Sequence, residues 1–219
     1  MTTTTAPVDT WEMVLVHRVF RREFRILPAL IRAVPPGDTG RAEIIGAHLA
    51  NLTGALHHHH TAEDELLWPV MLDRVGLRAD LVHRMEAQHE RLGGLLTRVD
   101  DLTARWRAAA GGEVRDELAD VLAEASGALD EHLADEERDL LPLVSAHVTP
   151  AEWDALNARA REAIPKSKLA LVFVGAVLEE ASPRETKLFL GQLPAPARLL
   201  WRLFGPGIYA KSRDSIRGG

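Results

Sequence analysis

The sequence of 219 residues contains no cysteine. This absence excludes disulfide bonds, thiolate metal sites and cysteine catalysis, and it fits a reducing compartment such as the cytoplasm. Aromatic residues make up only 5% of the chain, with a single tyrosine. The core must therefore consist mainly of Leu, Val and Ala, a composition that favours helices over sheets.

Long apolar runs are also absent. The run LALVFVGAVL at 169–178 has ten residues, whereas a membrane-spanning helix needs about 18. The first twelve residues, MTTTTAPVDTWE, lack the basic stretch followed by an apolar stretch that marks a secretory signal. We therefore expect a cytoplasmic protein without a transmembrane segment.

Negative charge exceeds positive charge overall, and the two are unevenly distributed along the chain. The net charge is −6, which argues against a nucleic-acid partner. Residues 166–219 nevertheless carry nine Lys and Arg against four Asp and Glu, a net of +5, so residues 1–165 carry −11. This asymmetry indicates two functional segments.

Four long stretches show apolar residues at helical spacing, separated by Pro and Gly breaks. The predicted helices span 10–33, 39–74, 79–109 and 113–147. Similar lengths and short connections predict an all-α, antiparallel four-helix up-and-down bundle. We expect a disordered N-terminus at 1–9, the bundle at 10–149, and a helical C-terminal extension at 150–219 that packs on the bundle.

Local signals refine the helix ends. Asp9, with Glu12 three residues later, is expected to cap the first helix. Pro28 and Pro69 fall inside helical patterns and are expected to kink or end those helices.

The extension is also predicted to be helical. Thr149-Pro150-Ala151-Glu152 and Ser182-Pro183-Arg184-Glu185 both combine a capping residue, a proline at the first helical position and a glutamate at the third. Its charge is opposite to that of the bundle and its apolar faces need a cover, so we expect it to dock on the bundle. Residues 210–219 are small and basic, and we expect them to be loosely ordered.

The stretch LHHHHTAEDELLWP at 56–69 contains four consecutive histidines. On a helix, Glu63 falls angularly between His59 and His60, at spacings of four and three residues. These three side chains can therefore meet on one face. His57 and His58 point away from Glu63 and are expected to flank the site or to be exposed.

The fourth predicted helix repeats this pattern, because His132 and Glu136 are again four residues apart. The first and third helices add His17 and His89. His89 precedes Gly111 by 22 residues and His132 follows it by 21, so the two lie at matching heights in antiparallel neighbours.

Five histidines and two glutamates thus fall inside one predicted bundle. Imidazole and carboxylate ligands together suit iron, manganese or zinc. Two carboxylates, each beside histidines on its own helix, suit two bridged metals better than one, and bundle cores are known to hold such sites.

The order H…HHxxE…H…HxxxE resembles the hemerythrin-like (HHE cation-binding) domain of bacterial type, over about residues 10–147. The matching residues are His17, His59, His60, Glu63, His89, His132 and Glu136. The resemblance implies a non-haem protein with two Fe ions in an oxo- or hydroxo-bridged di-iron centre. His60, His89 and His132 would bind one iron and His17 and His59 the other, with Glu63 and Glu136 as bridges.

The sequence departs from the oxygen-carrying hemerythrins of invertebrates. Met85 stands where those proteins have a second histidine, and His60 is the simplest replacement. Their second carboxylate follows the histidine by five residues, whereas Glu136 follows His132 by four. These departures count against reversible oxygen carriage but not against metal binding, and Glu86 or Glu137 could replace one of the named ligands.

The resemblance implies binding of a small diatomic ligand, O2 or NO, or of peroxide at an open iron position. The role would lie in oxygen, redox or NO response or in iron handling, and a peroxide- or NO-consuming oxidoreductase activity is left open. The alternative is a di-iron sensor that signals to a protein partner through the C-terminal segment. A structural zinc site is disfavoured, because such sites favour four closed N/S ligands.

Overall fold

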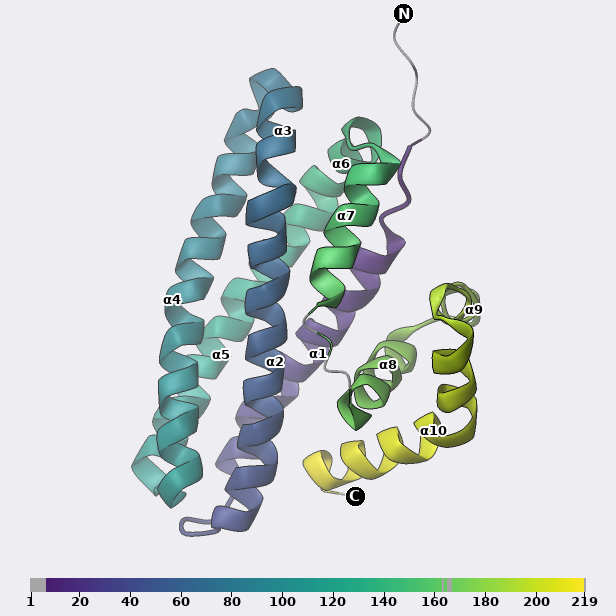
Figure 1. The fold of residues 1–219 in the computed structure, drawn as a ribbon. Helices are drawn as coiled ribbons and strands as arrows, with labels where there is room; N and C mark the ends of the chain where they lie inside the picture. The colour runs from purple at the N-terminus through teal and green to yellow at the C-terminus, as the bar shows by residue number, and fades with distance from the viewer. Residues whose placement is uncertain (1–6, 163, 165–166, 219) are drawn as a thin grey trace, which may run out of the picture. The chain divides into compact units, whose positions relative to one another are not determined.

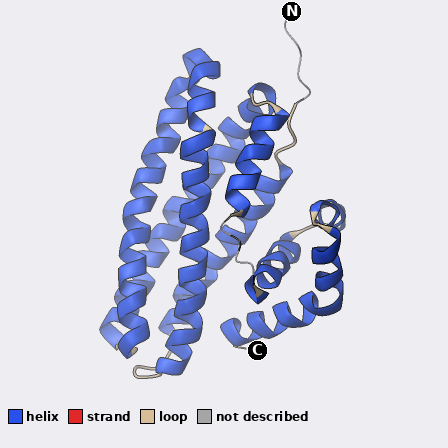
Figure 2. Cartoon of the chain, in the orientation of Figure 1, coloured by secondary structure: helices blue, strands red, loops and turns tan. Residues whose placement is uncertain are grey.

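The computed structural model describes residues 7–162, 164 and 167–218, and these residues form helices and connecting turns with no strand among them (Figures 1 and 2). In chain order the elements are α1 (Trp11–Arg32), α2 (Thr39–Leu66), α3 (Trp68–Val75), the 3-10 turn η1 (Gly76–Arg78), α4 (Ala79–Ala109), α5 (Gly112–Asp135), the π-helical turn η2 (Glu136–Leu140), α6 (Leu141–His147), α7 (Pro150–Arg161), α8 (Lys168–Glu180), α9 (Pro183–Gln192) and α10 (Ala195–Arg217).

Helix α4 packs along both α2 and α5. The second half of α1 contacts α2 through Glu23 and His48, and it contacts α5 through Arg32 and Asp120. The core between them is mainly leucine, valine and alanine, as the low aromatic content requires. The predicted all-α bundle is therefore confirmed.

Two of the prolines in helical patterns behave differently. Pro69 enters at the start of α3, so the predicted helix 39–74 divides after Leu66, as Pro69 led us to expect. Pro28 instead lies within α1, which continues to Arg32. Phe24, Leu27 and Ile31 around it are all fully buried, and this packing offsets the hydrogen bond that proline removes.

The expected cap at Asp9 is wrong. Helix α1 begins at Trp11 with Thr10 as its N-cap, and no side-chain hydrogen bond caps it. Glu12 instead contacts Gln192 through a hydrogen bond. Long-range packing therefore replaces the local capping box that the sequence pattern predicted.

Contacts divide the chain into two compact units, and the division passes through the middle of α1. The first unit comprises residues 1–10 and 21–163. Within it, α7 packs against α2, and Ser145 holds the backbone of Val8 by two hydrogen bonds. Of the N-terminal residues that we expected to be disordered, 1–6 lie outside the described part of the chain.

The second unit comprises residues 11–20 and 164–219. Leu15 and Val19 of α1 pack with Val177 of α8 in one apolar cluster. Helix α10 packs against α8 so closely that a Cβ atom on Gly175 would lie 2.2 Å from the ring of Tyr209. This unit therefore joins the start of the chain to its last helices.

Both predicted capping boxes of the C-terminal segment are confirmed, at Thr149 with Glu152 and at Ser182 with Glu185. The expected loose ending is wrong, because α10 continues to Arg217. Arg217 pairs with Glu179 of α8 at 2.9 Å, and Ile216 is buried. These contacts hold the last turns of the helix in place.

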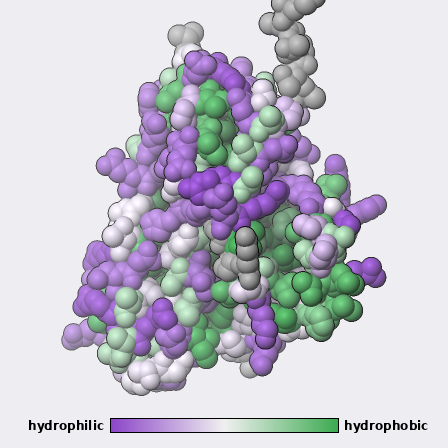
Figure 3. Space-filling view, in the orientation of Figure 1, coloured by the Kyte–Doolittle hydropathy of each residue, from purple (hydrophilic) through white to green (hydrophobic). Residues whose placement is uncertain are grey.

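The outer face of α10 carries exposed apolar side chains, namely Leu199, Leu200, Leu203 and Phe204. Figure 3 shows apolar surface gathered over the C-terminal helices. Within the described residues, no helix combines the length and apolar character that crossing a bilayer requires.

Candidate metal centre

The four consecutive histidines of α2 have different surroundings. His59 and His60 are 7% and 6% exposed, and Glu63 is fully buried. His58 turns the other way, and its Nε2 donates a hydrogen bond to the carbonyl oxygen of Arg159 at 2.7 Å. His57 is 39% exposed and lies 3.4 Å from Asp100. Helix periodicity therefore directs only His59 and His60 inward, beside Glu63.

Helices α4 and α5 bring two further histidines to the same place. His89 Nε2 lies 3.2 Å from His132 Nε2. The ring of His60 stacks on that of His89, with centroids 4.1 Å apart and planes inclined by 20°. His132 meets His60 edge-on at 5.2 Å. Three imidazoles from three helices thus surround one small volume.

The candidate ligand atoms fall into two groups, in each of which all atoms lie within 4.8 Å of one another. The first group contains His60, His89, His132 and Glu63. The second contains His17, which is fully buried on α1, with His59 and again Glu63. The histidines thus divide into three and two, and one carboxylate belongs to both groups.

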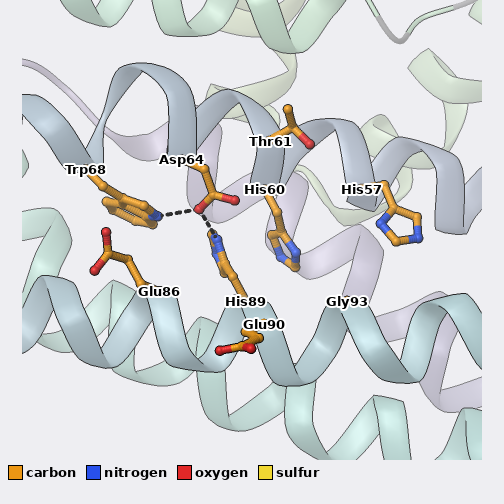
Figure 4. A pocket seen from close by; sticks show the side chains of 9 residues that line it. All are labelled: His57, His60, Thr61, Asp64, Trp68, Glu86, His89, Glu90 and Gly93. Atoms are coloured by element: carbon orange, nitrogen blue, oxygen red, sulfur yellow. Dashed lines mark hydrogen bonds and ion pairs between the residues drawn. The ribbon is translucent and has the colours of Figure 1, made fainter.

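Asp64 fixes the orientation of His89. Its carboxylate lies 2.7 Å from His89 Nδ1 and accepts a second hydrogen bond from Trp68 Nε1 at 2.8 Å (Figure 4). An ionised carboxylate only accepts hydrogen bonds, so Nδ1 of His89 carries the proton. In the neutral ring, Nε2 is then a lone-pair donor that points to the interior.

Gln88 plays the corresponding part for His132. Its amide nitrogen donates to Asp135 at 3.0 Å, which leaves its amide oxygen 3.2 Å from His132 Nδ1. Because that oxygen only accepts, Nδ1 of His132 also carries a proton. Two Nε2 lone pairs therefore face each other across 3.2 Å. A cation between them would turn this repulsion into coordination, and such outer hydrogen bonds are typical of histidine metal ligands.

Glu63 is the most unusual carboxylate of the centre. Both of its oxygens are buried and lack a hydrogen-bond partner among the described residues. They lie 3.3 Å from His59 Nε2 and 3.5 Å from His89 Nε2. Burial raises the pKa of Glu63 well above its usual value, and the charges of Glu136 and Asp64 raise this pKa further. A bound cation would reverse this effect, so the residues fit a metal site.

Glu136 lies at the first position of the π-helical turn η2 and is fully buried, 3.8 Å from His132 Nε2. It belongs to neither group of ligand atoms, although its charge acts on Glu63. Glu137, the alternative five residues after His132, pairs with Arg21 at 2.7 Å. The wider π-helical turn is a feature that recurs at functional sites.

Glu86, the other alternative ligand, lies at the surface of α4, where it accepts a hydrogen bond from His83 Nδ1 at 2.8 Å. The remaining neighbour of interest, His48, donates to Glu23 at 2.9 Å. Neither Glu86 nor His48 is part of the two groups of ligand atoms.

Sequence reasoning missed two residues of this centre, Asp64 and Gln88. Each immediately adjoins a candidate ligand in the sequence, and both hydrogen-bond to the outer nitrogen of a buried histidine. The available signal was that such histidines usually have an oxygen partner for that nitrogen. Glu86, on the helix of His89 itself, bonds to His83, whereas Asp64 reaches the outer nitrogen of His89 from α2.

Comparison with known proteins assigns a family to this arrangement. The hemerythrin HHE cation binding domain matches residues 8–144, a range that includes all seven predicted ligands. No curated protein and no solved structure matches the chain significantly.

Proposed function

Because this chain belongs to the hemerythrin HHE cation-binding family, we propose that its cation site is a di-iron centre. His60, His89 and His132 would hold one iron, and His17 and His59 the other. Glu63 and Glu136 would bridge the two. The nitrogen- and oxygen-rich ligand set without sulfur suits iron in this role.

One observation carries this proposal: the ligand atoms fall into a three-histidine and a two-histidine group that share Glu63. A site for a single metal would need only one such group of ligand atoms. Two groups with a common carboxylate are what a bridged pair of metals requires. The position of Glu136 beside His132, within the electrostatic reach of Glu63, supports it as the second bridge.

When bound, the two irons would supply redox chemistry and, on the iron with two histidines, an open position for O2, peroxide or NO. The chain's own residues have simpler tasks. Asp64 and Gln88 keep protons on Nδ1 of His89 and His132, so that both Nε2 atoms stay available. The burial of the ligands, each 7% exposed or less, limits their contact with bulk water and strengthens the electrostatic interactions among them.

We place this activity in oxygen, redox or NO response or in iron handling in the cytoplasm, with a peroxide- or NO-consuming oxidoreductase reaction as its enzymatic form. Elemental analysis of the purified protein tests the centre, with the optical spectrum before and after reduction and re-exposure to air. We expect two irons per chain and a spectrum that changes on reduction. One metal per chain, or predominantly zinc, would exclude the proposal.

A second candidate function, a di-iron sensor, rests on the packing of α1. The turns of α1 on either side of His17 belong to the unit of the C-terminal helices, since Leu15 and Val19 pack with Val177. Arg18 also binds Glu185 and the carbonyl oxygen of Glu180. A change at His17 would thus reach α8 and α9 directly.

Hydrogen exchange distinguishes the two functions. In a sensor, oxidation or ligand binding at the irons should change the exchange of amides in residues 168–192 as well as 11–20. Exchange in 168–192 that is the same in every state of the centre would rule out signalling through these helices. It would leave the enzymatic function standing.

A further inference from the structure

A pocket of about 340 Å³ lies between α2 and α4 (Figure 4). It is lined by His57, His60, Thr61, Asp64, Trp68, Glu86, His89, Glu90 and Gly93. Thr61 and Glu90 in this lining are exposed, whereas His60 and His89 are each only 6% exposed. The pocket therefore leads from the surface to the three-histidine group.

The inner wall of the pocket consists of two candidate ligands, His60 and His89. Neither His17 nor His59 lines it. The pocket thus reaches the centre on the side where all three imidazoles would already bind a metal. This position suits passage of the metal itself better than delivery of a small ligand to the open position on the other iron.

The lining is acidic. It contains the carboxylates of Asp64, Glu86 and Glu90, and none of the described residues that line it is Lys or Arg. One oxygen of Asp64 accepts hydrogen bonds from both His89 and Trp68, and one oxygen of Glu86 accepts a hydrogen bond from His83. Glu86 and Glu90 lie one helical turn apart on α4, on either side of His89. A cleft lined by one sign of charge raises the local concentration of ions of the opposite sign.

The size fits a hydrated cation. Each water occupies about 30 Å³ of liquid, so a pocket of about 340 Å³ has room for an ion with its first hydration shell. Oxygen ligands at the pocket surface could replace those waters one at a time before the ion meets imidazole nitrogen.

We propose that this pocket is the route by which a hydrated divalent cation reaches and leaves the three-histidine site, with Glu86 and Glu90 as its transient ligands. This inference rests on the proposed function. It adds a path and two residues that act on the rate of metal exchange without holding the metal at equilibrium.

Gly93 allows the route to be blocked. A Cβ atom on Gly93, or on its neighbour Gly94, meets nothing within 4 Å, so both positions accept a larger side chain. Only Gly93 lines the pocket. Gly93→Trp should therefore fill it, and Gly94→Trp is the matched control on the same helix. Gly93→Leu serves if the tryptophan variant does not fold.

The experiment follows Fe²⁺ in both directions, without oxygen and with the full-length protein. Release from the reduced iron-loaded protein to a bulky chelator gives the exit rate, and addition of Fe²⁺ to the stripped protein gives the loading rate. Gly93→Trp should slow both by about tenfold or more, since packed interiors leave little room for passage. Gly94→Trp should stay within about twofold of the unaltered chain.

The charge of the route is tested by Glu86→Gln combined with Glu90→Gln. Loading should slow by about tenfold at low ionic strength, and the difference should shrink as salt is added. The control Glu113→Gln with Glu117→Gln makes the same change of net charge on α5 and should not alter the loading rate. A double variant that loads at the unaltered rate would exclude the two carboxylates as transient ligands.

The final iron content separates this inference from the proposed function. We expect all variants to reach the same content and to differ only in rate. If the unaltered chain binds no iron, the proposed function fails and the route fails with it. If Gly93→Trp loads and releases iron at the unaltered rate, the route is overturned while the di-iron centre stands.

Discussion

Glu23 and Glu63 are both buried glutamates that lie beside a histidine, but their surroundings differ. Glu23 on α1 accepts hydrogen bonds from His48 at 2.9 Å and from Arg22 at 2.8 Å. Burial would raise the pKa of Glu23, but these hydrogen bonds and the charges of His48 and Arg22 outweigh burial and lower the pKa to about 2. Glu63 has no hydrogen-bond partner among the described residues, and its pKa is raised.

The difference separates a structural ion pair from a candidate metal ligand. The charge of Glu23 is satisfied by the protein itself, so nothing further is needed. A carboxylate such as Glu63, buried without hydrogen bonds, costs free energy in the absence of a cation. Buried glutamate beside histidine is therefore not diagnostic by itself, and the hydrogen bonds around the carboxylate decide its role.

The largest expected effect follows from removing the charge of Glu63. Glu63→Gln keeps the shape but takes the shared carboxylate from both groups, so iron should fall from two per chain to one or none. Elemental analysis checks this. Glu65→Gln, an exposed position on the same helix, should keep both irons. Full iron content in the Glu63 variant would show that the charge of Glu63, like that of Glu23, is not needed for metal binding.

The histidines of α2 allow a second comparison, between a side chain that faces Glu63 and side chains that do not. His60→Ala should lose at least one iron, because the three-histidine group then keeps two imidazoles. The combined change of His57 and His58 to Ala should keep both irons, since neither side chain faces Glu63. Iron-to-protein ratios after gel filtration give the answer, and an unchanged ratio in the His60 variant would contradict the three-and-two division.

A smaller effect is expected from Asp64, which would act on a bound metal through its hydrogen bond to His89. Asp64→Asn can still accept the hydrogen bond from Nδ1, but without a charge. Iron affinity should fall by about 10–100-fold with the ligand set intact. Competition with a chelator measures this affinity. Asp101→Asn, on the surface of α4, is the control. If the Asp64 variant binds iron as tightly as this control does, Asp64 has no role in metal binding.

The last prediction concerns Glu23, which is expected to affect the stability of the fold and not the binding of metal. Because the folded pKa of about 2 lies below the ordinary value of 4.5, Glu23 stabilises the fold above about pH 4.5. This contribution of about 3 kcal/mol is lost as the pH falls toward 2. In the metal-free protein, Glu23→Gln should lower the free energy of unfolding at pH 7 and flatten its loss in acid.

Denaturant unfolding across this pH range measures the effect of Glu23. Glu43→Gln, which removes an exposed partner of Arg107, should leave the acid profile as it was, since exposed pairs are screened by water. An acid profile that Glu23→Gln does not change would mean that His48 and Arg22 do not hold this carboxylate in its charged form.

Much of the fold followed from periodicity and punctuation. The predicted helix 79–109 has the same bounds in the structure, and Pro69 and the two capping boxes ended or began helices as expected. Predictions from local sequence were wrong where a residue instead contacts a residue far away in the chain. Glu12 bonds to Gln192 instead of capping α1, and packing of Ile216 and Arg217 orders the tail that composition suggested was loose.

Helix geometry was enough to predict which histidines and glutamates point into the bundle. The seven residues chosen from the sequence are all buried, at 7% exposure or less. Asp64 and Gln88 depend on side-chain rotamers and on the distance between two helices, which no single-helix pattern contains. The π-helical turn at Glu136 is a departure from regular spacing, so reasoning from a constant 3.6 residues per turn could not find it.

The division of the chain inside α1 has a consequence for the order of synthesis. Arg18 binds Glu180 and Glu185, which follow it by 162 and 167 residues. Helix α1 is therefore synthesised long before α8 and α9, and the face that carries Arg18 stays uncovered until those helices are made. We expect residues 11–20 to be the latest part of the protein to gain protection during translation, and stalled chains that end near residue 163 should show this as fast hydrogen exchange there. His17, the first candidate ligand to be made, would then be the last to be held firmly in place.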